Sequence, residues 1–291
     1  MAGEWVDHYR RTWAPATLKR NESLVNNILA ELLDRPLAGI DEAALLAHLL
    51  DVRRSGRGES ASRARVIVSQ IFDHAIATRR ATVNPAKGLV GNRALRAPRR
   101  THYAALPWQK LGAFARALDA APVTPMVRDA LLVMILTWQR EGTVRAMRWS
   151  DIHDGDWIIP AEVMKSRARH VVPLPAAARK LIEAQPRGGE FVFGSSASAG
   201  FLSSNTLAKA CRAAGFEVTA HGFRSTGAGW ASEHGFDFAA IERQLAHTLD
   251  PVQAAYHRGE LIEQRRKMLA DYATFIAREK RRHGTSTSST P

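Results

Sequence analysis

The stretch AHGFRSTGAGWASEHGFDFAAIERQLAHTLDPVQAAYHR, residues 220–258, decides how the fold and function of this chain are interpreted. It carries His221 and Arg224 three residues apart, a second histidine at His247 and a tyrosine at Tyr256. Residues three apart share one face of a helix, so His221 and Arg224 are expected side by side. Cationic side chains grouped with a tyrosine suit the negative charge of a phosphodiester. The stretch therefore predicts a phosphodiester site.

Each of these residues also has an ordinary structural explanation. Asp250 and Pro251 are expected to be the N-cap and first residue of a helix, with Tyr256 in its second turn. A tyrosine at helical spacing most often packs against a core. A histidine near the end of a helix, such as His247, can simply complement the helix dipole. The rest of the chain must therefore decide between the two interpretations.

Length and charge favour two domains and a polyanionic partner. The 291 residues suffice for two ordinary domains. The chain has 41 Lys and Arg against 28 Asp and Glu, a formal charge of +13. Such a surplus favours nucleic acid, because cationic side chains that neutralise phosphates release counterions. The alternative at this point is a basic soluble enzyme with no nucleic-acid partner.

Cysteine content and hydropathy indicate in which cellular compartment the protein is expected. The single cysteine, Cys211, cannot form an internal disulfide or a cysteine zinc cluster, and an inert buried thiol is expected. The chain opens without an apolar leader, and its longest apolar run, 131–138, is too short to cross a bilayer. We therefore expect a cytoplasmic protein with no membrane partner.

The first third of the chain is predicted to be helical. Apolar residues recur at helical spacing over 17–33, 41–52 and 60–78. A bundle of about four helices with one basic face fits this pattern, although such a face can also be merely solvated. From Asn84 to Leu106 the period is lost among Pro, Gly and arginine residues, which predicts a basic linker.

The remainder predicts a mainly α fold with a small antiparallel β-sheet, an α+β class. The run LLVMILTW is apolar on all sides, which indicates a buried helix, and Arg140 follows it closely. Two short strands, 157–160 and 170–174, flank a basic connection that contains Lys165. Taken alone, Arg140 could cap the preceding helix and Lys165 could be solvated. Helices are expected at about 107–119, 125–138, 176–184, 204–214, 221–234, 238–246, 252–257 and 260–281, and a further strand at 191–193.

The chemistry of the site must be supplied by the protein's own cations. The sequence has no glycine-rich phosphate loop, no metal-ligand spacing and no acidic pair of the two-metal nuclease kind. Phosphoryl transfer then needs donors for the non-bridging oxygens, an acid for the leaving oxygen and an acceptor for the nucleophile's proton. Arginine grips two phosphate oxygens with a planar fork that stays charged. No metal and no nucleotide cofactor is expected.

Four motifs occur together in the second part of the chain. They are LTWQREGTVRAMRWSDI (136–152), WIIPAEVMKSRARHVVPLP (157–175), TAHGFRST (219–226) and IERQLAHTLDPVQAAYHR (241–258). In order and spacing they resemble the tyrosine recombinases, the phage-type integrases of prophages and genomic islands. The first part resembles the helical core-binding domain of the same integrases through ATLKRNESLVNNIL (16–29), RARVIVSQIFDHAI (63–76) and VNPAKGL (83–89). The resemblance covers nearly the whole chain.

The resemblance implies which residues act on the phosphate. Arg140 and Arg224 would clamp the scissile phosphate, and Lys165 would be the general acid for the leaving 5′-hydroxyl. The activity implied is cutting and rejoining of DNA at specific sites, for integration or excision of a mobile element.

The resemblance also implies the nucleophile and its partners. Tyr256 would attack the phosphate and form a 3′-phosphotyrosine, His221 would accept the tyrosine proton, and His247 would donate a hydrogen bond to a phosphate oxygen. The 5′-hydroxyl of a partner strand would then reverse the step.

The family pattern further implies domains and partners. Residues 1–97 would form a helical, SAM-like core-binding domain with a basic linker from about 84, residues 98–283 the catalytic domain, and 284–291 a disordered tail. Both would enclose double-stranded DNA as a C-shaped clamp, and a homo-tetramer would assemble on two attachment sites in the nucleoid. A host DNA-bending protein and a directionality factor are further expected partners. The arm-binding domain that often precedes this pattern is missing from the sequence.

Two features leave alternatives open. The family usually has Glu or Asp three residues after the first arginine, where this chain has Thr143, an uncharged residue. A catalytically impaired integrase that only binds DNA is therefore the alternative from another class. A type IB topoisomerase would use the same chemistry, but the core-binding resemblance argues against it, and a basic structural protein would require coincidence. The last helix would pack on its own domain or dock on a neighbouring protomer.

Overall fold

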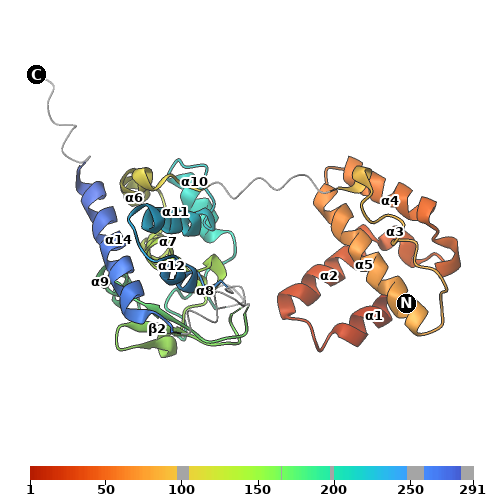
Figure 1. Ribbon diagram of the computed structural model, residues 1–291, viewed down its shortest axis with the longest axis horizontal. Helices are drawn as coiled ribbons and strands as arrows, with labels where there is room; N and C mark the ends of the chain where they lie inside the picture. Colours follow the sequence, from red (N-terminus) through yellow and green to blue (C-terminus); the bar gives the residue numbers. More distant parts are fainter. Residues whose placement is uncertain (97–104, 165, 197–199, 248–258, 283–291) are drawn as a thin grey trace, which may run out of the picture. The chain divides into compact units, whose positions relative to one another are not determined.

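The computed structural model describes residues 1–96, 105–164, 166–196, 200–247 and 259–282 (Figure 1). The chain divides into two compact units, Met1–Arg100 and Thr101–Pro291, each with a hydrophobic core of its own. Lys165, Tyr256 and the tail at 284–291 lie outside the described residues. Each unit is described by itself below.

The first unit is a helical bundle, as the sequence predicted. Asp41 caps one helix by accepting a hydrogen bond from the Ala44 amide at 2.7 Å, which satisfies a donor at that helix's beginning. Trp5, Leu45 and Leu49 are among the fully buried side chains of its core. The elements are α1 (Ala2–Tyr9), α2 (Pro15–Ile28), α3 (Ala30–Leu33), η1 (Leu37–Gly39), α4 (Glu42–Arg54), α5 (Gly58–Ala77) and η2 (Arg93–Leu95).

The irregular run that begins at Asn84 packs onto the first unit instead of linking the two units there. The Asn84 amide donates to the Ser69 carbonyl and to Asp73 Oδ1, each at 2.9 Å. Ala86, Leu89 and Leu95 are buried in the same core. The run lacks a sequence period because it consists of turns held by side-chain bonds, and absence of a period alone does not distinguish it from a linker.

The second unit combines helices with a small antiparallel sheet, and this confirms the predicted fold class. In the part of the chain that the structure describes, the strands are ordered β1 (Ile152–His153), β2 (Asp156–Ile159) and β3 (His170–Pro173). Trp157 pairs with Val172, and Ile159 with His170, at the end of the hairpin nearest residue 165. The helical elements are η3 (Trp108–Lys110), α6 (Leu111–Ala120), α7 (Pro125–Thr137), α8 (Glu141–Arg145), η4 (Trp149–Asp151), α9 (Ala176–Glu183), α10 (Thr206–Ala213), α11 (Gly222–Glu233), α12 (Phe238–Gln244) and α14 (Ile262–Arg282).

Helix α7 is the buried centre of the second unit, with α6, α9, α10, α11 and α14 against it. The C-terminal helix α14 packs on its own unit, as one of the two sequence alternatives proposed, and buries Met268, Leu269 and Tyr272 completely. Gly112 lets α6 approach α14 closely, because a Cβ there would lie 2.5 Å from the Glu279 backbone. The unit is therefore organised around one apolar helix.

One predicted strand does not form, and the structure contains two elements, strand β1 and helix α1, that the sequence did not predict. The Phe191–Phe193 run forms no strand, since it contributes a single bridge between Phe191 and Arg148 while Val192 and Phe193 fill the core. Residues 191–193 are all apolar and show no alternation of apolar and polar side chains. Such a run indicates burial but does not indicate that the backbone pairs with a neighbouring strand. No helix within the described ranges has the length and hydrophobicity to span a bilayer.

The contact between α11 and the end of α7 gives a test of this packing. A Cβ at Gly227 would lie 2.3 Å from Nε1 of Trp138, a fully buried ring. Gly227→Ala should therefore destabilise the second unit by about 2 kcal/mol through overpacking. Gly229→Ala in the same helix is the matched control, because nothing lies within 4 Å of its Cβ position. It should stabilise the helix by up to about 1 kcal/mol. Urea unfolding midpoints measure both, and equal midpoints for the two variants would contradict the described contact.

Candidate active site

The end of α7 positions Arg140. Trp138 takes a left-handed conformation (φ 56°) directly after the helix and buries its ring, which turns the chain sharply. Gln139 is buried, and Arg140 then begins α8 in extended conformation with its carbonyl accepting from the Thr143 amide at 2.9 Å. The Arg140 side chain is half-buried. A helix stop and a helix start within three residues thus fix the first arginine.

The second arginine, Arg224, is buried in the first turn of α11 and is 4% exposed. Its guanidinium donates to the Trp138 carbonyl and, at 2.5 Å, to the Leu245 carbonyl. Burial and the nearby charge of Arg140 together lower the pKa of Arg224 to about 10, and the charge of Glu242 opposes the change. Arg224 therefore remains charged at neutral pH while it joins the ends of α7, α11 and α12.

The two histidines lie beside these arginines. His221 precedes α11 and is exposed, and its pKa is lowered by partial burial and by the charges of Arg224, Arg140 and His247. His247 follows α12 after Ala246, which has a left-handed φ of 49°. Its Nδ1 lies 3.0 Å from Glu242 Oε2, and its side chain is 44% exposed. The structure thus gathers Arg140, His221, Arg224 and His247 into one cationic group.

Lys165 and Tyr256, the remaining sequence candidates, lie outside the described residues. The elements that flank them belong to the same region of the second unit. β2 and β3 lie on either side of residue 165, and α12 and α14 on either side of 248–258. Lys165 and Tyr256 stay predictions from the sequence.

His170 is a half-buried titratable residue that sequence reasoning missed. It begins β3, and burial together with the charges of Arg265, Arg224 and Arg140 lowers its pKa to about 3, partly offset by a hydrogen bond with the Gln244 backbone. Its Nε2 has no hydrogen-bond partner among the residues that the structure describes. A neutral imidazole thus lies among the cations of the site. A lone histidine at the start of a strand carries no signal of this role in the sequence.

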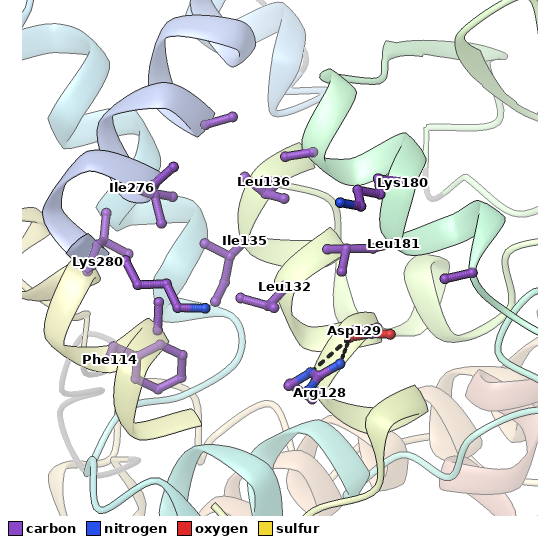
Figure 2. A pocket seen from close by; sticks show the side chains of 16 residues that line it. Phe114, Arg128, Asp129, Leu132, Ile135, Leu136, Lys180, Leu181, Ile276 and Lys280 are labelled. Atoms are coloured by element: carbon purple, nitrogen blue, oxygen red, sulfur yellow. Dashed lines mark hydrogen bonds and ion pairs between the residues drawn. The ribbon is translucent and has the colours of Figure 1, made fainter. Parts of the chain in front are cut away.

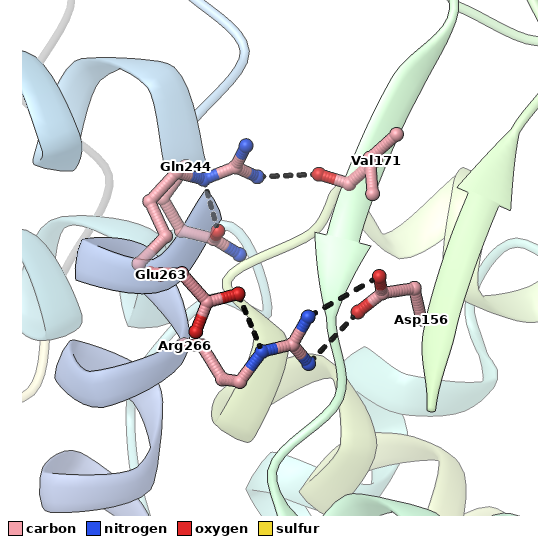
Figure 3. Close-up of polar contacts among 6 residues, drawn as sticks. Asp156, Val171, Gln244, Glu263 and Arg266 are labelled. Carbon is pink, nitrogen blue, oxygen red and sulfur yellow. Dashed lines mark hydrogen bonds and ion pairs between the residues drawn. The ribbon is translucent and has the colours of Figure 1, made fainter. Parts of the chain in front are cut away.

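A set of buried side chains holds the backbone around the cationic group. Gln139 donates to the Gln244 carbonyl at 2.9 Å, and the Gln244 amide donates to the Thr137 carbonyl at 2.7 Å. Arg265 of α14, 1% exposed, donates to Gln244 Oε1 at 2.9 Å and to the Val171 carbonyl at 2.6 Å. Figure 3 shows Gln244 and Val171 joined in this way across the gap between α12 and β3. These bonds connect α7, α12, β3 and α14 at one place.

The departure at Thr143 leaves α8 without a carboxylate at that position. Thr143 is half-buried in α8. The neighbouring carboxylate, Glu141, lies 3.6 Å from Arg145 in an ion pair, and burial raises its pKa. The carboxylate whose charge raises the pKa of Arg224 is that of Glu242, in α12.

An apolar hollow of the second unit lies away from this group. Figure 2 shows a cavity of about 410 Å³ between α6, α7, α9 and α14. Apolar side chains such as Phe114, Leu132 and Ile276 point into it, and Lys180 and Lys280 also line it. None of the four cationic site residues lines this cavity, so it is not where a phosphate would react. Across the described ranges, no three His, Cys, Asp or Glu side chains are grouped as metal ligands.

Comparison with known proteins matches both units to one family. Residues 1–92 match the phage integrase central domain, and residues 109–259 match the phage integrase family. The prophage integrase IntZ of Escherichia coli K12 is 32% identical over 285 residues, which span 95% of this chain and 70% of that protein. The chain belongs to the phage integrase family. It is thus a tyrosine site-specific recombinase, as its sequence motifs predicted.

Further relatives and solved structures agree with this assignment. The integrase of Enterobacteria phage P4 is 33% identical over 257 residues, covering 80% of this chain and 58% of the phage protein. A lambda integrase tetramer bound to a Holliday junction has a TM-score of 0.67 and 25% identity, over 86% of this chain and 78% of that one. A lambda integrase dimer bound to a core site has the same fold, with a TM-score of 0.67 and 24% identity over 86% and 96% of the two chains.

Two adjacent arginines of α14 test the contribution of the buried bonds. Arg265→Leu leaves buried acceptors on Gln244 and Val171 without a donor and should cost about 3 kcal/mol of unfolding free energy. Arg266→Leu removes an ion pair with Asp156 at 3.0 Å whose arginine is 38% exposed, and should cost less than about 1 kcal/mol. Urea unfolding of both variants measures the difference, and similar losses at the two positions would refute the argument.

His170 predicts a pH dependence of stability. Its folded pKa of about 3 lies below the usual value of 6.5, so the unfolded chain takes up a proton first as pH falls. Its contribution is complete above about pH 6.5 and declines toward pH 3, at about 1.4 kcal/mol per pH unit. His170→Asn should therefore lose less stability than the wild type between about pH 6.5 and pH 5. Parallel losses in urea unfolding over that interval would show that His170 is not buried in its neutral form.

Proposed function

We propose that the protein cuts and rejoins DNA at specific sites through a 3′-phosphotyrosine intermediate. The observation that supports this most is the convergence of Arg140, His221, Arg224 and His247, which come from three separate sequence motifs and act on one another electrostatically. Such a group of cations and donors suits a phosphate whose negative charge increases in the transition state. Its work would be integration or excision of a mobile element.

The two arginines would clamp the non-bridging oxygens of the scissile phosphate. Arg224 is already immobilised by two backbone carbonyls, so little side-chain entropy remains to be lost when phosphate binds. Arg140 lies on the adjacent turn and is partly exposed. Permanent charge and fixed orientation would stabilise the transition state more than the bound substrate, because negative charge on the phosphate increases in the transition state.

The remaining steps would move one proton to and one proton from the reacting oxygens. The Tyr256 oxygen would form a bond to phosphorus as the bond to the 5′-oxygen breaks, and His221 would take the phenol proton. The lowered pKa of His221 leaves its ring neutral at neutral pH, which a proton acceptor requires. Lys165 would protonate the leaving 5′-oxygen, and the 5′-hydroxyl of a partner strand would later reverse these bonds.

Tyr256 is favoured as the nucleophile over Tyr272, a tyrosine that the structure describes in the second unit. Tyr272 is fully buried in α14, and burial raises its pKa, so its phenolate is strongly disfavoured. Its ring packs against Trp138 and Trp230 as part of the core. A structural role therefore accounts for Tyr272, and the family motif assigns the attack to Tyr256.

The partners follow from charge and from the relatives. The net charge of +13 suits double-stranded DNA, and lambda integrase has been solved as a tetramer on a Holliday junction. We infer a homo-tetramer on two attachment sites, with residues 1–97 as the core-binding domain and 98–283 as the catalytic domain. A host DNA-bending protein and a directionality factor belong to the same proposal, as does association with the nucleoid.

The second candidate function is DNA binding without cleavage. Thr143 favours it, because α8 offers no carboxylate there and Glu141 is paired with Arg145 instead. In this case the four side chains would contact the backbone of the attachment site but would not activate it.

Covalent trapping distinguishes the two functions. In a duplex that carries the attachment site and a nick close to the cleavage point, cleavage frees a short fragment that bears the 5′-hydroxyl. Once this fragment has dissociated, the reaction cannot reverse and the protein stays joined to DNA. Wild type should form an adduct that survives denaturation, and Tyr256→Phe should form none because it lacks the attacking oxygen. Tyr272→Phe is the matched control and should retain adduct formation, since Tyr272 lies in the core. Wild type that binds the duplex in a gel shift without forming an adduct would favour the DNA-binding alternative.

A further inference from the structure

The side chains of Glu242 and His247 form a pair inside the cationic group. Glu242 Oε2 lies 3.0 Å from Nδ1 of His247, and the His247 amide donates to the Glu242 carbonyl at 3.1 Å. Both bonds close the same six-residue segment, 242–247, at the end of α12. The left-handed conformation of Ala246 allows this reversal, which brings the imidazole back over the helix.

Glu242 is a carboxylate that interacts with two residues of the cationic group, His247 and Arg224. Its side chain is 21% exposed, and its charge raises the pKa of Arg224 against the effects of burial and Arg140. The ion pair of Glu141 with Arg145 leaves that carboxylate committed elsewhere, and Thr143 has none. The Glu242 carboxylate thus contacts His247 directly and acts on Arg224 through its charge.

The orientation of His247 follows from which ring nitrogen Glu242 contacts. A carboxylate accepts only, so Nδ1 must carry hydrogen for the 3.0 Å contact to be a hydrogen bond. The opposite nitrogen, Nε2, is then directed away from Glu242 and is available to donate to a phosphate oxygen when the ring is protonated. Fixing one ring nitrogen in this way sets both the tautomer and the plane of the imidazole.

We propose that Glu242 is a positioning residue that orients His247 toward the scissile phosphate and supplies the carboxylate that Thr143 lacks. The inference rests on the proposed recombinase function for its catalytic consequence, but the pairing itself exists in the protein without DNA. Glu242 touches no reacting atom and acts through His247.

The first test needs no DNA. Long-range proton–nitrogen NMR of the ¹⁵N-labelled full chain reports which histidine nitrogens carry hydrogen, and His247→Gln identifies the His247 signals. At about pH 8, Nδ1 of His247 should carry hydrogen in the wild type and lose it in Glu242→Ala, where no acceptor holds it. Glu233→Ala, at an exposed glutamate that ends α11, is the matched control and should leave the signals unchanged. The same Nδ1 state in wild type and Glu242→Ala would overturn the proposal.

The second test measures the rate of adduct formation on the nicked duplex. Glu242→Ala should lower the rate about tenfold, as expected for loss of a group that orients a catalytic side chain. In the His247→Gln background the same change should cost less than about twofold, because the histidine it orients is gone. An equal loss in both backgrounds, or a wild-type rate in Glu242→Ala, would contradict the proposal.

The two tests separate this proposal from the proposed function. Absence of an adduct from wild type would contradict recombination, while the NMR measurement would still decide whether Glu242 holds His247. Circular dichroism and unfolding midpoints of Glu242→Ala should match the wild type to within about 1 kcal/mol, since alanine suits a helix and the side chain is partly exposed.

Discussion

The hydrogen bonds of the Arg224 guanidinium are the interactions on which the candidate active site depends. The guanidinium donates to the carbonyls of Trp138 and Leu245, which are each two residues ahead of another site residue, Arg140 and His247. One buried cation thereby fixes the distance between the backbone segments that carry two others. A buried charge without a carboxylate partner is costly, and here backbone dipoles from two helix ends stabilise it. The same group that would grip the phosphate thus assembles the site before phosphate arrives.

The surrounding bonds make that arrangement rigid. Gln139, Gln244 and Arg265 each donate to a backbone carbonyl at the junction of α7, α12, β3 and α14. Arg265 belongs to α14, the helix that follows residues 248–258, and its bond to the Val171 carbonyl joins that helix to β3. β3 is the strand that follows residue 165 in the sequence. The described elements that adjoin Lys165 and Tyr256 in the sequence, β3 and α14, are therefore joined to each other by this bond.

The sequence predicted the fold where local pattern determined structure. The apolar run of α7 and the paired short strands needed no tertiary information, and the family motifs named the four residues that the structure brings together. The bonds of Arg224, Gln139 and Arg265 were beyond sequence reasoning, because they join side chains to carbonyls about a hundred residues away, and carbonyls have no sequence signature. The turns held by Asn84 and the single bridge at Phe191 were missed because neither has a sequence period, and the neutral state of His170 because it depends on burial and on charges from other elements.

A crystal structure of the protein held on nicked attachment-site DNA would test the central claim most directly. We expect a scissile phosphate within hydrogen-bond distance of Arg140, Arg224 and Nε2 of His247, with the Tyr256 oxygen joined to phosphorus. Arg224 should still donate to the carbonyls of Trp138 and Leu245, as it does in the protein alone. A phosphate bound elsewhere, or an Arg224 that has left both carbonyls, would contradict the claim that this arginine assembles the site in advance.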